Sequence, residues 1–342
     1  MGYRVVVVGT MGNVGLEILN ILAEREFPID EIQAVASSIA TGQRVSFGED
    51  DVLNVIPITD FDFRGFDFAF FSAGNIVSAE FVPIAAEAGC IVIESSSHFR
   101  QELEIPLIVP EVNPEALANY KAYNIIANPN CVALSLAMAL KPLHDKAKIR
   151  RVVVSTYQSV SGVGRPAMDE LFNQTRAIYM NQPVKKEEFP KQIAFNVIPQ
   201  CDNFMPDGTT AEETRIAFET QKILGVDIGM AVTCVRVPVF IGHSVAVAVE
   251  LENPLSTAEA RALWKKFPGL SIVDYRQEDG YVTPAEVVGE DAVFISRIRE
   301  DKSVKNGLLF WLSVDNLRKG TALNAVQIAE RLVKDYLENG SA

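Results

Sequence analysis

The beginning of the chain constrains its fold more than any other segment. Residues 5–8 form the apolar run VVVV, and residues 9–15 read GTMGNVG before a helix-like pattern that continues to about Arg25. A buried strand, a glycine-rich turn and a helix in this order are typical of dinucleotide-binding units, since glycine lets the backbone approach a pyrophosphate and the helix N-terminus offers N–H donors. The spacing GxxGxxG is a variant of the usual fingerprint, and the alternative is a tight turn that binds nothing. Its position between a strand and a helix favours the nucleotide interpretation.

Further alternating segments extend this pattern. Strands are predicted at 32–38, 66–71 and 90–94, with a helix at about 78–88. Such alternation predicts a doubly wound, Rossmann-like parallel sheet with ligands at the carboxyl ends of its strands. The second strand ends at Ser37 and Ser38, where an acidic residue would indicate NAD and an arginine NADP. Neither is present and the nearest cation is Arg44, so this strand leaves the cofactor open.

Length and composition narrow the class of protein. At 342 residues the chain exceeds the usual size of a domain with a single hydrophobic core, so two domains are expected. A net charge of -13 argues against nucleic acid and anionic membranes as partners. Four cysteines without CxxC spacing and three histidines suggest neither disulfides nor a metal site. With no signal-peptide pattern and no apolar run long enough to span a bilayer, a reducing cytoplasmic location is expected.

A cysteine at 131 is the clearest candidate nucleophile. It ends the turn NPNC at 128–131 and precedes the apolar, helix-like segment 132–140. A helix N-terminus favours a thiolate and any oxyanion formed beside it. The alternative is a small apolar residue that packs under a helix. Cys90 and Cys234 lie within apolar patterns and are expected in the core.

Other polar residues lie at the ends of predicted strands. Gln158 ends a strand at 151–158, before a glycine-containing loop and a helix at 166–179. His243 precedes a strand at 245–251 and is the best general acid/base candidate, because imidazole titrates near neutrality. Arg236 lies among valines and would be costly to bury without an anion, whereas Arg100 follows the strand at 90–94. From spacing alone, structural roles remain equally open for Gln158, His243 and Arg236, and a solvated role is the more common one for an arginine placed like Arg100.

Four motifs in this order carry a family resemblance. They are NPNC at 128–131, TYQSVSG at 156–162, RVPVFIGHS at 236–244 and SVDNLRKGTALNAVQIAE at 313–330. The whole chain resembles the bacterial aspartate-semialdehyde dehydrogenases. The resemblance implies reversible, NADPH-dependent reductive dephosphorylation of L-4-aspartyl phosphate to aspartate 4-semialdehyde, in lysine (diaminopimelate), methionine and threonine biosynthesis. It also implies a cofactor domain at 1–129 with about 314–342, an α+β catalytic and dimerisation domain with a mixed sheet at 130–313, and a homodimer, with a homotetramer as the alternative.

The resemblance also assigns residues. It makes Cys131 the nucleophile, His243 the acid/base and Gln158 the group that orients substrate and thioester. The substrate residues are Arg236 for the α-carboxylate, Glu212 for the amine, Arg100 and Arg215 for phosphate, and Asn130. The cofactor residues are Gly9, Thr10, Met11, Gly12, Asn13, Val14, Ser37, Ser38, Ser72, Gly74, Ser161, Gly162 and Asn316.

Several positions depart from the family pattern. Ile39 stands where the family has an arginine for the NADP 2'-phosphate, which predicts a weakened preference for NADP and possible use of NAD. Arg215 replaces a lysine, Val132 and Ala133 replace hydroxyl residues after the nucleophile, and Glu94 replaces an aspartate. Two alternatives remain: a related acyl-phosphate reductase of the N-acetyl-glutamyl-phosphate type, and a non-catalytic paralogue.

Overall fold

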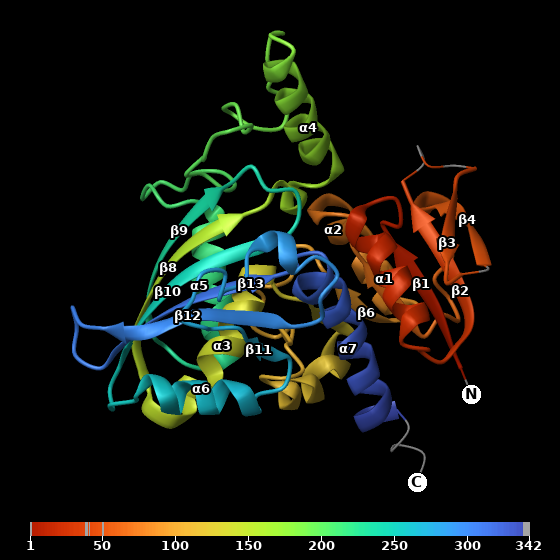
Figure 1. Cartoon of the computed structure of the whole chain (residues 1–342). Helices are drawn as coiled ribbons and strands as arrows, with labels where there is room; N and C mark the ends of the chain where they lie inside the picture. Colours follow the sequence, from red (N-terminus) through yellow and green to blue (C-terminus); the bar gives the residue numbers. More distant parts are fainter. Residues whose placement is uncertain (1, 38–39, 41, 50, 338–342) are drawn as a thin grey trace. The chain divides into compact units, whose positions relative to one another are not determined.

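The chain folds into two compact units. The computed structural model describes residues 2–37, 40, 42–49 and 51–337 (Figure 1). The first unit contains residues 1–130 and 321–342, and the second contains residues 131–320. The chain therefore returns from the second unit to the first at 320/321 and not at about 313/314. The reason is that Asp315 and Asn316 bond within the second unit, where their side chains accept the N–H groups of Gly289 and Gly242.

The first unit contains a seven-stranded sheet in the order β3-β4-β2-β1-β5-β6-β7. All its pairs are parallel except the antiparallel β3–β4. The predicted doubly wound parallel sheet is thus confirmed, with the additional strands β3, β4 and β7 that sequence patterns did not identify. The strands are β1 (Tyr3–Val8), β2 (Ile29–Ala36), β3 (Arg44–Phe47), β4 (Asp51–Pro57), β5 (Phe68–Phe71), β6 (Ile91–Glu94) and β7 (Ile125–Ala127).

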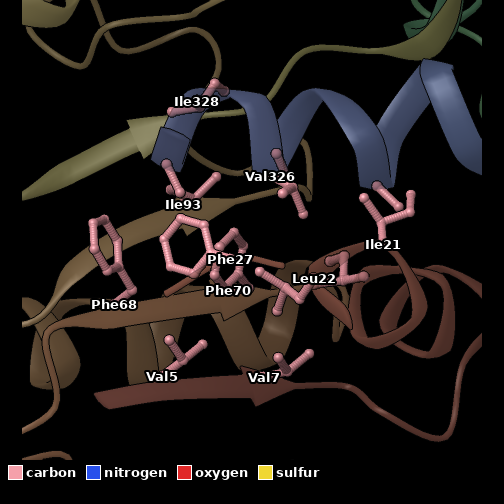
Figure 2. Close-up of a cluster of buried hydrophobic side chains, with 14 of the residues drawn as sticks. Val5, Val7, Ile21, Leu22, Phe27, Phe68, Phe70, Ile93, Val326 and Ile328 are labelled. Atoms are coloured by element: carbon pink, nitrogen blue, oxygen red, sulfur yellow. The ribbon is translucent and has the colours of Figure 1, made fainter. Parts of the chain in front are cut away.

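One apolar core joins this sheet to helices from both ends of the chain. Helix α1 (Asn13–Glu24) and helix α7 (Asn324–Leu332) contact each other and the sheet, and α2 (Asn75–Glu87) contacts β5 and β6. Figure 2 shows side chains of β1, β5 and β6 meeting Leu22 of α1 and Val326 of α7. The last helical segment of the chain is irregular, because wider π-helical turns at Arg318–Leu323 and Val333–Leu337 flank α7.

The second unit contains a six-stranded mixed sheet in the order β11-β12-β13-β10-β8-β9. Its three central pairs are antiparallel, and the β11–β12 and β8–β9 pairs at the edges are parallel. The strands are β8 (Ile149–Gln158), β9 (Gly229–Arg236), β10 (His243–Leu251), β11 (Leu270–Ile272), β12 (Val293–Asp301) and β13 (Gly307–Val314). The predicted mixed, antiparallel-rich sheet is confirmed.

Helices pack against this sheet around α3. Helix α3 (Cys131–Ala147) contacts β8 and β10 and also α5 (Ala211–Leu224) and α6 (Thr257–Lys266). Helix α4 (Arg165–Tyr179) lies apart from them (Figure 1) and forms its own small core with residues such as Phe189 and Ile193. Short 3-10 turns occur at Ile58–Asp60, Pro114–Ala122, Val160–Val163 and Pro284–Glu286. Among the described residues, no helix is both long and apolar enough to cross a bilayer.

Candidate active site

The glycine-rich turn of the first unit forms a cradle for a nucleotide. Gly9 has φ +94°, and a Cβ there would lie 2.6 Å from the carbonyl oxygen of Ser72. A Cβ on Gly15 would lie 2.3 Å from the carbonyl oxygen of Gly9, so the third glycine lets the helix approach the turn. Only glycine fits these two positions without a shift of the backbone. The turn therefore has the close approach that a dinucleotide requires.

A groove of about 230 Å³ runs along this turn. It is lined by five of the predicted cofactor residues, Gly9, Met11, Gly12, Ser37 and Ser72. Helix α1 begins next to it at Asn13 and continues through Val14, so its N-terminal N–H groups and dipole favour an anion there. The residues present thus fit a pyrophosphate-containing cofactor. Gly74, with φ +82°, precedes the first residue of α2.

The side chain of Thr10, one of the predicted cofactor residues, is bonded within the fold, and two further positions lie outside the described residues. The side chain of Thr10 is fully buried, and both its N–H and its hydroxyl donate to the carbonyl of Val35, 3.3 Å away in each case. Thr10 therefore ties the turn to β2, and its side chain does not face the groove. Ser38 and Ile39 lie outside the described residues.

Arg100 is buried within the first unit and binds the two loops that carry family motifs. Its guanidinium donates to the carbonyl of Asn128, at 2.9 Å, and to the carbonyl of Ser95. Glu94, fully buried at the end of β6, accepts the Ser78 hydroxyl at 2.8 Å and the N–H of Ser96. The glutamate that departs from the family pattern thus orders the loop after β6. Asn130 is also buried.

Cys131 is the first residue of α3, as the sequence predicted, and its side chain is half-buried. A Cβ on Gly320 would lie 2.7 Å from the Cβ of Cys131, so the chain passes close to the thiol there. The N–H of Gly320 donates to the carbonyl of Asp315 at 2.9 Å, which places the turn at 315–320 beside the nucleophile. Val132 and Ala133 are fully buried, so the hydroxyls absent at these positions would have lain in the core.

The other three thiols are unreactive by comparison. Cys90, Cys201 and Cys234 are buried, as expected for Cys90 and Cys234. Burial raises the pKa of Cys90 to about 12 and that of Cys201 to about 11, and it raises the pKa of Cys234 further still.

Gln158 and Arg236 are neighbours at the ends of two parallel strands. They are paired in the β8–β9 register, and both are buried. The amide nitrogen of Gln158 donates to Glu212 Oε1 at 3.2 Å. Within the described residues, Oε1 of Gln158 is buried without a hydrogen-bond partner. A buried orphan acceptor is costly, so this atom is a candidate ligand for a donor on the substrate.

Glu212 and Arg215 form a fixed charge cluster in the first turn of α5. Thr210 caps the helix through a capping box with Glu213, which sets the direction of this turn. Arg215 forms ion pairs with Asp202 and, at 2.8 Å, with Glu212. Burial alone would raise the pKa of Asp202, but the hydrogen bonds from Arg215 and from the N–H of Asn203, together with the charge of Arg215, outweigh burial and lower that pKa. Two carboxylates thus offset the charge of Arg215, a contact that the sequence did not reveal.

His243, the first residue of β10, is buried and held by Ser159. Its Nδ1 accepts the main-chain N–H of Ser159 at 3.1 Å and lies 3.0 Å from the Ser159 hydroxyl. Burial, followed by the charge of Arg236, lowers the pKa of His243 to about 3, and the carboxylate of Glu212 acts in the opposite direction. His243 is therefore a neutral imidazole at physiological pH.

Three residues predicted to bind cofactor surround this histidine. Asn316 Oδ1 accepts the hydroxyls of Ser159 and Ser161, at 3.2 and 3.1 Å, and Asn316 Nδ2 donates back to Ser161 at 3.0 Å. A Cβ on Gly162 would lie 3.1 Å from Arg236 Nη1 and 3.3 Å from His243 Nε2. Ser161, Gly162 and Asn316 thus shape the surroundings of His243. Ser159 was missed, and the only signal was its place directly after Gln158.

Comparison with known proteins agrees with this architecture. Residues 4–120 match the model "Semialdehyde dehydrogenase, NAD binding domain", and residues 140–319 match "Semialdehyde dehydrogenase, dimerisation domain". The chain is 50% identical over 335 residues to aspartate-semialdehyde dehydrogenase of Rickettsia bellii (strain RML369-C), covering 98% of this chain and 99% of that one.

Solved structures are similar as well. Aspartate semialdehyde dehydrogenase II from Vibrio cholerae has a TM-score of 0.95 and 44% identity, with 98% of this chain and 100% of that chain covered. The same enzyme is also known complexed with ASA (TM-score 0.95, 43% identity, 98% and 99% covered). The aspartate semialdehyde dehydrogenase with NADP from Candida albicans, 22% identical with a TM-score of 0.74 and coverage of 97% and 98%, shares the fold.

A Rossmann-like NAD(P)-binding unit, a mixed-sheet dimerisation domain and a cysteine at a helix N-terminus define a semialdehyde dehydrogenase. The full-length identity to the curated enzymes is more specific than this class. The chain belongs to the aspartate-semialdehyde dehydrogenase family, and it is an oxidoreductase of amino-acid biosynthesis with that activity. The predicted resemblance, fold class and function are confirmed.

Proposed function

We propose that the enzyme reduces L-4-aspartyl phosphate to aspartate 4-semialdehyde through a thioester on Cys131, with NADPH as the physiological reductant. The observation that carries this proposal is the half-buried thiol at the first residue of α3. The helix dipole and the N–H groups of its first turn favour the thiolate and can stabilise a tetrahedral oxyanion. The three buried thiols have no comparable setting.

The proposed reaction can be written with the Cys131 thiolate as its single nucleophile. The thiolate of Cys131 forms a bond to the acyl carbon, the bond from that carbon to the phosphate oxygen breaks, and the departing phosphate takes one proton from solvent. When bound, the nicotinamide cofactor supplies the hydride that converts the thioester carbon into a hemithioacetal carbon. The C–S bond then breaks, sulfur leaves as thiolate, and the oxygen electron pair completes the aldehyde carbonyl.

Substrate binding follows from charge and burial. We assign the α-carboxylate to Arg236, since its guanidinium is buried and donates to a neutral group, the carbonyl of Ser159 at 2.8 Å, and a buried charge favours an anion as partner. We assign the ammonium to Glu212 and to the orphan Oε1 of Gln158, both of which are acceptors. Arg100 and Arg215 are assigned to phosphate. An N-acetylated substrate has no ammonium for Glu212, which disfavours the N-acetyl-glutamyl-phosphate alternative.

Cofactor preference depends on a missing charge. Ile39 stands where the family has an arginine, so the charge-assisted contact of that arginine to the 2'-phosphate, worth roughly 1.5 to 3 kcal/mol, is not expected from this position. We expect the preference for NADPH over NADH to shrink about tenfold or more. Comparison of kcat/KM for the two cofactors tests this, and a ratio above about a thousand in favour of NADPH would refute it.

The central test is a substitution of the nucleophile. We expect Cys131→Ser to lower kcat on the order of 10⁴-fold, with NADPH oxidation or NADP⁺ reduction followed at the nicotinamide absorbance band. Binding of NADPH, measured by fluorescence titration, should be unchanged. The control is Cys201→Ala, which removes a buried thiol of the same unit. Turnover by Cys131→Ser at the wild-type rate would overturn the proposal, and would favour a different nucleophile.

We also propose that the second unit forms a homodimer and that the enzyme works in the cytoplasm, where cysteines that form no disulfide persist.

A further inference from the structure

The first asparagine of the turn NPNC is fully buried, and the proposed function gives it no role. The N–H of Asn128 donates to the carbonyl of Glu94 at 2.7 Å, and its own carbonyl accepts Nε of Arg100 at 2.9 Å. Because Pro129 follows, the backbone of Asn128 is also restricted to extended conformations. The main chain of Asn128 is thus anchored to the end of β6 and to the segment after it.

The side chain of Asn128 joins a second buried asparagine. Its Nδ2 donates to Ser95 Oγ at 3.1 Å and to the carbonyl of Thr321 at 3.0 Å. Its Oδ1 accepts Nδ2 of Asn324, the first residue of α7, at 2.7 Å, and the same Nδ2 donates to the carbonyl of Ile108 at 2.9 Å. Main-chain carbonyls can only accept, so the two that end this chain of bonds fix the orientation of both amides.

These bonds lie beside both points at which the chain passes between the units, 130/131 and 320/321. Only the Pro-Asn pair at 129–130 separates Asn128 from Cys131. On the other side, Thr321 directly follows Gly320, where a Cβ would lie 2.7 Å from the Cβ of Cys131. A shift of the Asn128 side chain would therefore move both segments that adjoin the nucleophile.

The pair of amides is retained at a cost. Among the described residues, Oδ1 of Asn324 is buried without a hydrogen-bond partner, and Asn324 is fully buried. A buried orphan acceptor is unfavourable, and local exceptions of this kind are expected at functional sites. This argues for a role of the pair beyond stability.

We propose that Asn128 is a positioning residue for the reaction at Cys131, and that Asn324 acts through it. Together they hold the turn before the nucleophile and the segment at Gly320 in one arrangement, which keeps the thiol at the first N–H groups of α3. Asn128 is not a catalytic residue, because its hydrogen bonds all go to other parts of the fold. The inference rests on the proposed thioester function.

The main test compares turnover with the reactivity of the thiol. In Asn128→Ser we expect kcat to fall about 10²-fold, as for a displacement of about 1 Å, with the KM of NADPH unchanged. Alkylation of Cys131 by iodoacetamide at pH 7, without substrate, should slow about tenfold as the sulfur leaves the helix axis. The alkylation rate depends on the position of the thiol and requires no turnover.

A double-mutant cycle tests whether Asn324 acts through Asn128. We expect Asn324→Ser to lower kcat about tenfold, and the double variant to match Asn128→Ser within about twofold, because residues in one hydrogen-bond network are not additive. Independent effects would instead multiply to about 10³-fold. That result would overturn the coupling of the two asparagines.

The matched control is Asn113→Ser in the same unit. Asn113 is a buried amide that accepts the N–H of Val109 and donates to the carbonyl of Leu107, each at 2.9 Å. We expect a similar loss of Tm with wild-type kcat and alkylation rate. If Asn113→Ser slowed both rates as much as Asn128→Ser, or if Asn128→Ser kept both at the wild-type level, the positioning role would be wrong.

A milder variant decides the question if Asn128→Ser does not fold. Ser95→Ala removes one of the two acceptors of Asn128 Nδ2, and we expect kcat and the alkylation rate to fall together about threefold. Wild-type rates would then overturn the inference. If Cys131→Ser is inactive but the positioning variants match wild type, only this inference fails. If Cys131→Ser remains active, the proposed function fails, and the alkylation rates still report how Asn128 places the thiol.

Discussion

At the scale of single residues, the active centre depends on a histidine that the protein keeps neutral. Burial and Arg236 lower the pKa of His243 to about 3, from an ordinary value of 6.5. The folded state therefore binds no proton there between these two values, whereas the unfolded chain does. The neutral ring is a stabilising feature above pH 6.5 that is lost progressively as the pH falls toward 3.

This linkage predicts the effect of a substitution on acid stability. His243→Gln removes the titrating group, so we expect it to lose less unfolding free energy than wild type between about pH 7.5 and 5. Urea unfolding at the two pH values measures this difference. The control is His98→Gln, which removes an exposed imidazole and should match wild type. Equal pH dependence in His243→Gln and wild type would contradict the buried neutral ring.

A second residue-scale prediction concerns the contact between Gly320 and the nucleophile. In Gly320→Ala the new Cβ would lie 2.7 Å from Cys131 Cβ, so the thiol must shift. A displacement of about 1 Å can cost on the order of 10²-fold in rate, and crowding of this kind costs about 1–3 kcal/mol of stability. Steady-state kinetics and urea unfolding test both effects.

The matched control for this substitution is Gly229→Ala. The nearest atom to a Cβ on Gly229 lies 3.5 Å away, which is an ordinary contact. We expect it to behave as wild type. If Gly320→Ala were as active as Gly229→Ala, the close packing beside the thiol would have no catalytic consequence.

At the scale of elements, the ends of helices and strands place most of the functional side chains. Cys131 begins α3, Glu212 lies in the first turn of α5, and α1 begins beside the nucleotide groove. Local sequence signals set where these helices begin: the turn NPN precedes α3, and the capping box of Thr210 precedes α5.

The cap of α5 gives a testable prediction. Thr210→Ala removes the acceptor for the N–H of Glu213, at 3.3 Å, and should cost about 1 kcal/mol of stability. Because Glu212 is in the same turn, we also expect a higher KM for aspartate semialdehyde. Thermal unfolding and initial rates provide the two measurements.

Helix α6 supplies the control, because Ser256 forms the same capping box there with Glu259. Ser256→Ala should lose similar stability without a change in KM. A rise in KM in both variants would show that the effect is global and not a displacement of Glu212.

Regular patterns explain which elements the sequence predicted. In β8 the buried residues Val152, Val154 and Thr156 alternate with more exposed ones, a period-two signal that is visible in the sequence. The edge strand β3 and its neighbour β4 lack a continuous apolar run, and the sequence did not indicate them. Residues 180–210 have no long regular element, so nothing in the sequence placed Asp202 beside Arg215.

Sequence patterns likewise located some residues of the candidate site but not the contacts between them. Cys131, Gln158 and His243 occupy motifs next to strand or helix ends, which a sequence pattern can locate. The bond between Ser159 and His243 joins residues 84 positions apart and depends on the pairing of β8 with β10. Such a contact follows from the three-dimensional register and not from local preference.

At the scale of the whole molecule, charge and apolar surface act in opposite directions on assembly. Most exposed large apolar side chains belong to the second unit, which contains the matched dimerisation domain. Examples are Phe172, Tyr179, Phe195 and Phe204. The chain also carries a net charge of -13, which makes two copies repel at low salt.

We therefore expect a homodimer that is tighter at higher ionic strength. Sedimentation velocity at about 20 and 200 mM salt should show the dimer fraction rising, because the Debye length shortens between these conditions. A monomer at all micromolar concentrations and both salt levels would contradict the proposed dimer.

The domain that the sequence predicted at 130–313 overlaps the second unit but ends too early. The chain returns to the first unit only after the turn at 315–320 that packs on Cys131.

The burial of three of the four thiols has a practical use. A soluble alkylating reagent at neutral pH should meet a single sulfur on each chain, so the amount of reagent consumed counts the competent active centres in a preparation. The enzyme thus contains its own internal standard, against which turnover can be expressed per working molecule without any engineered label.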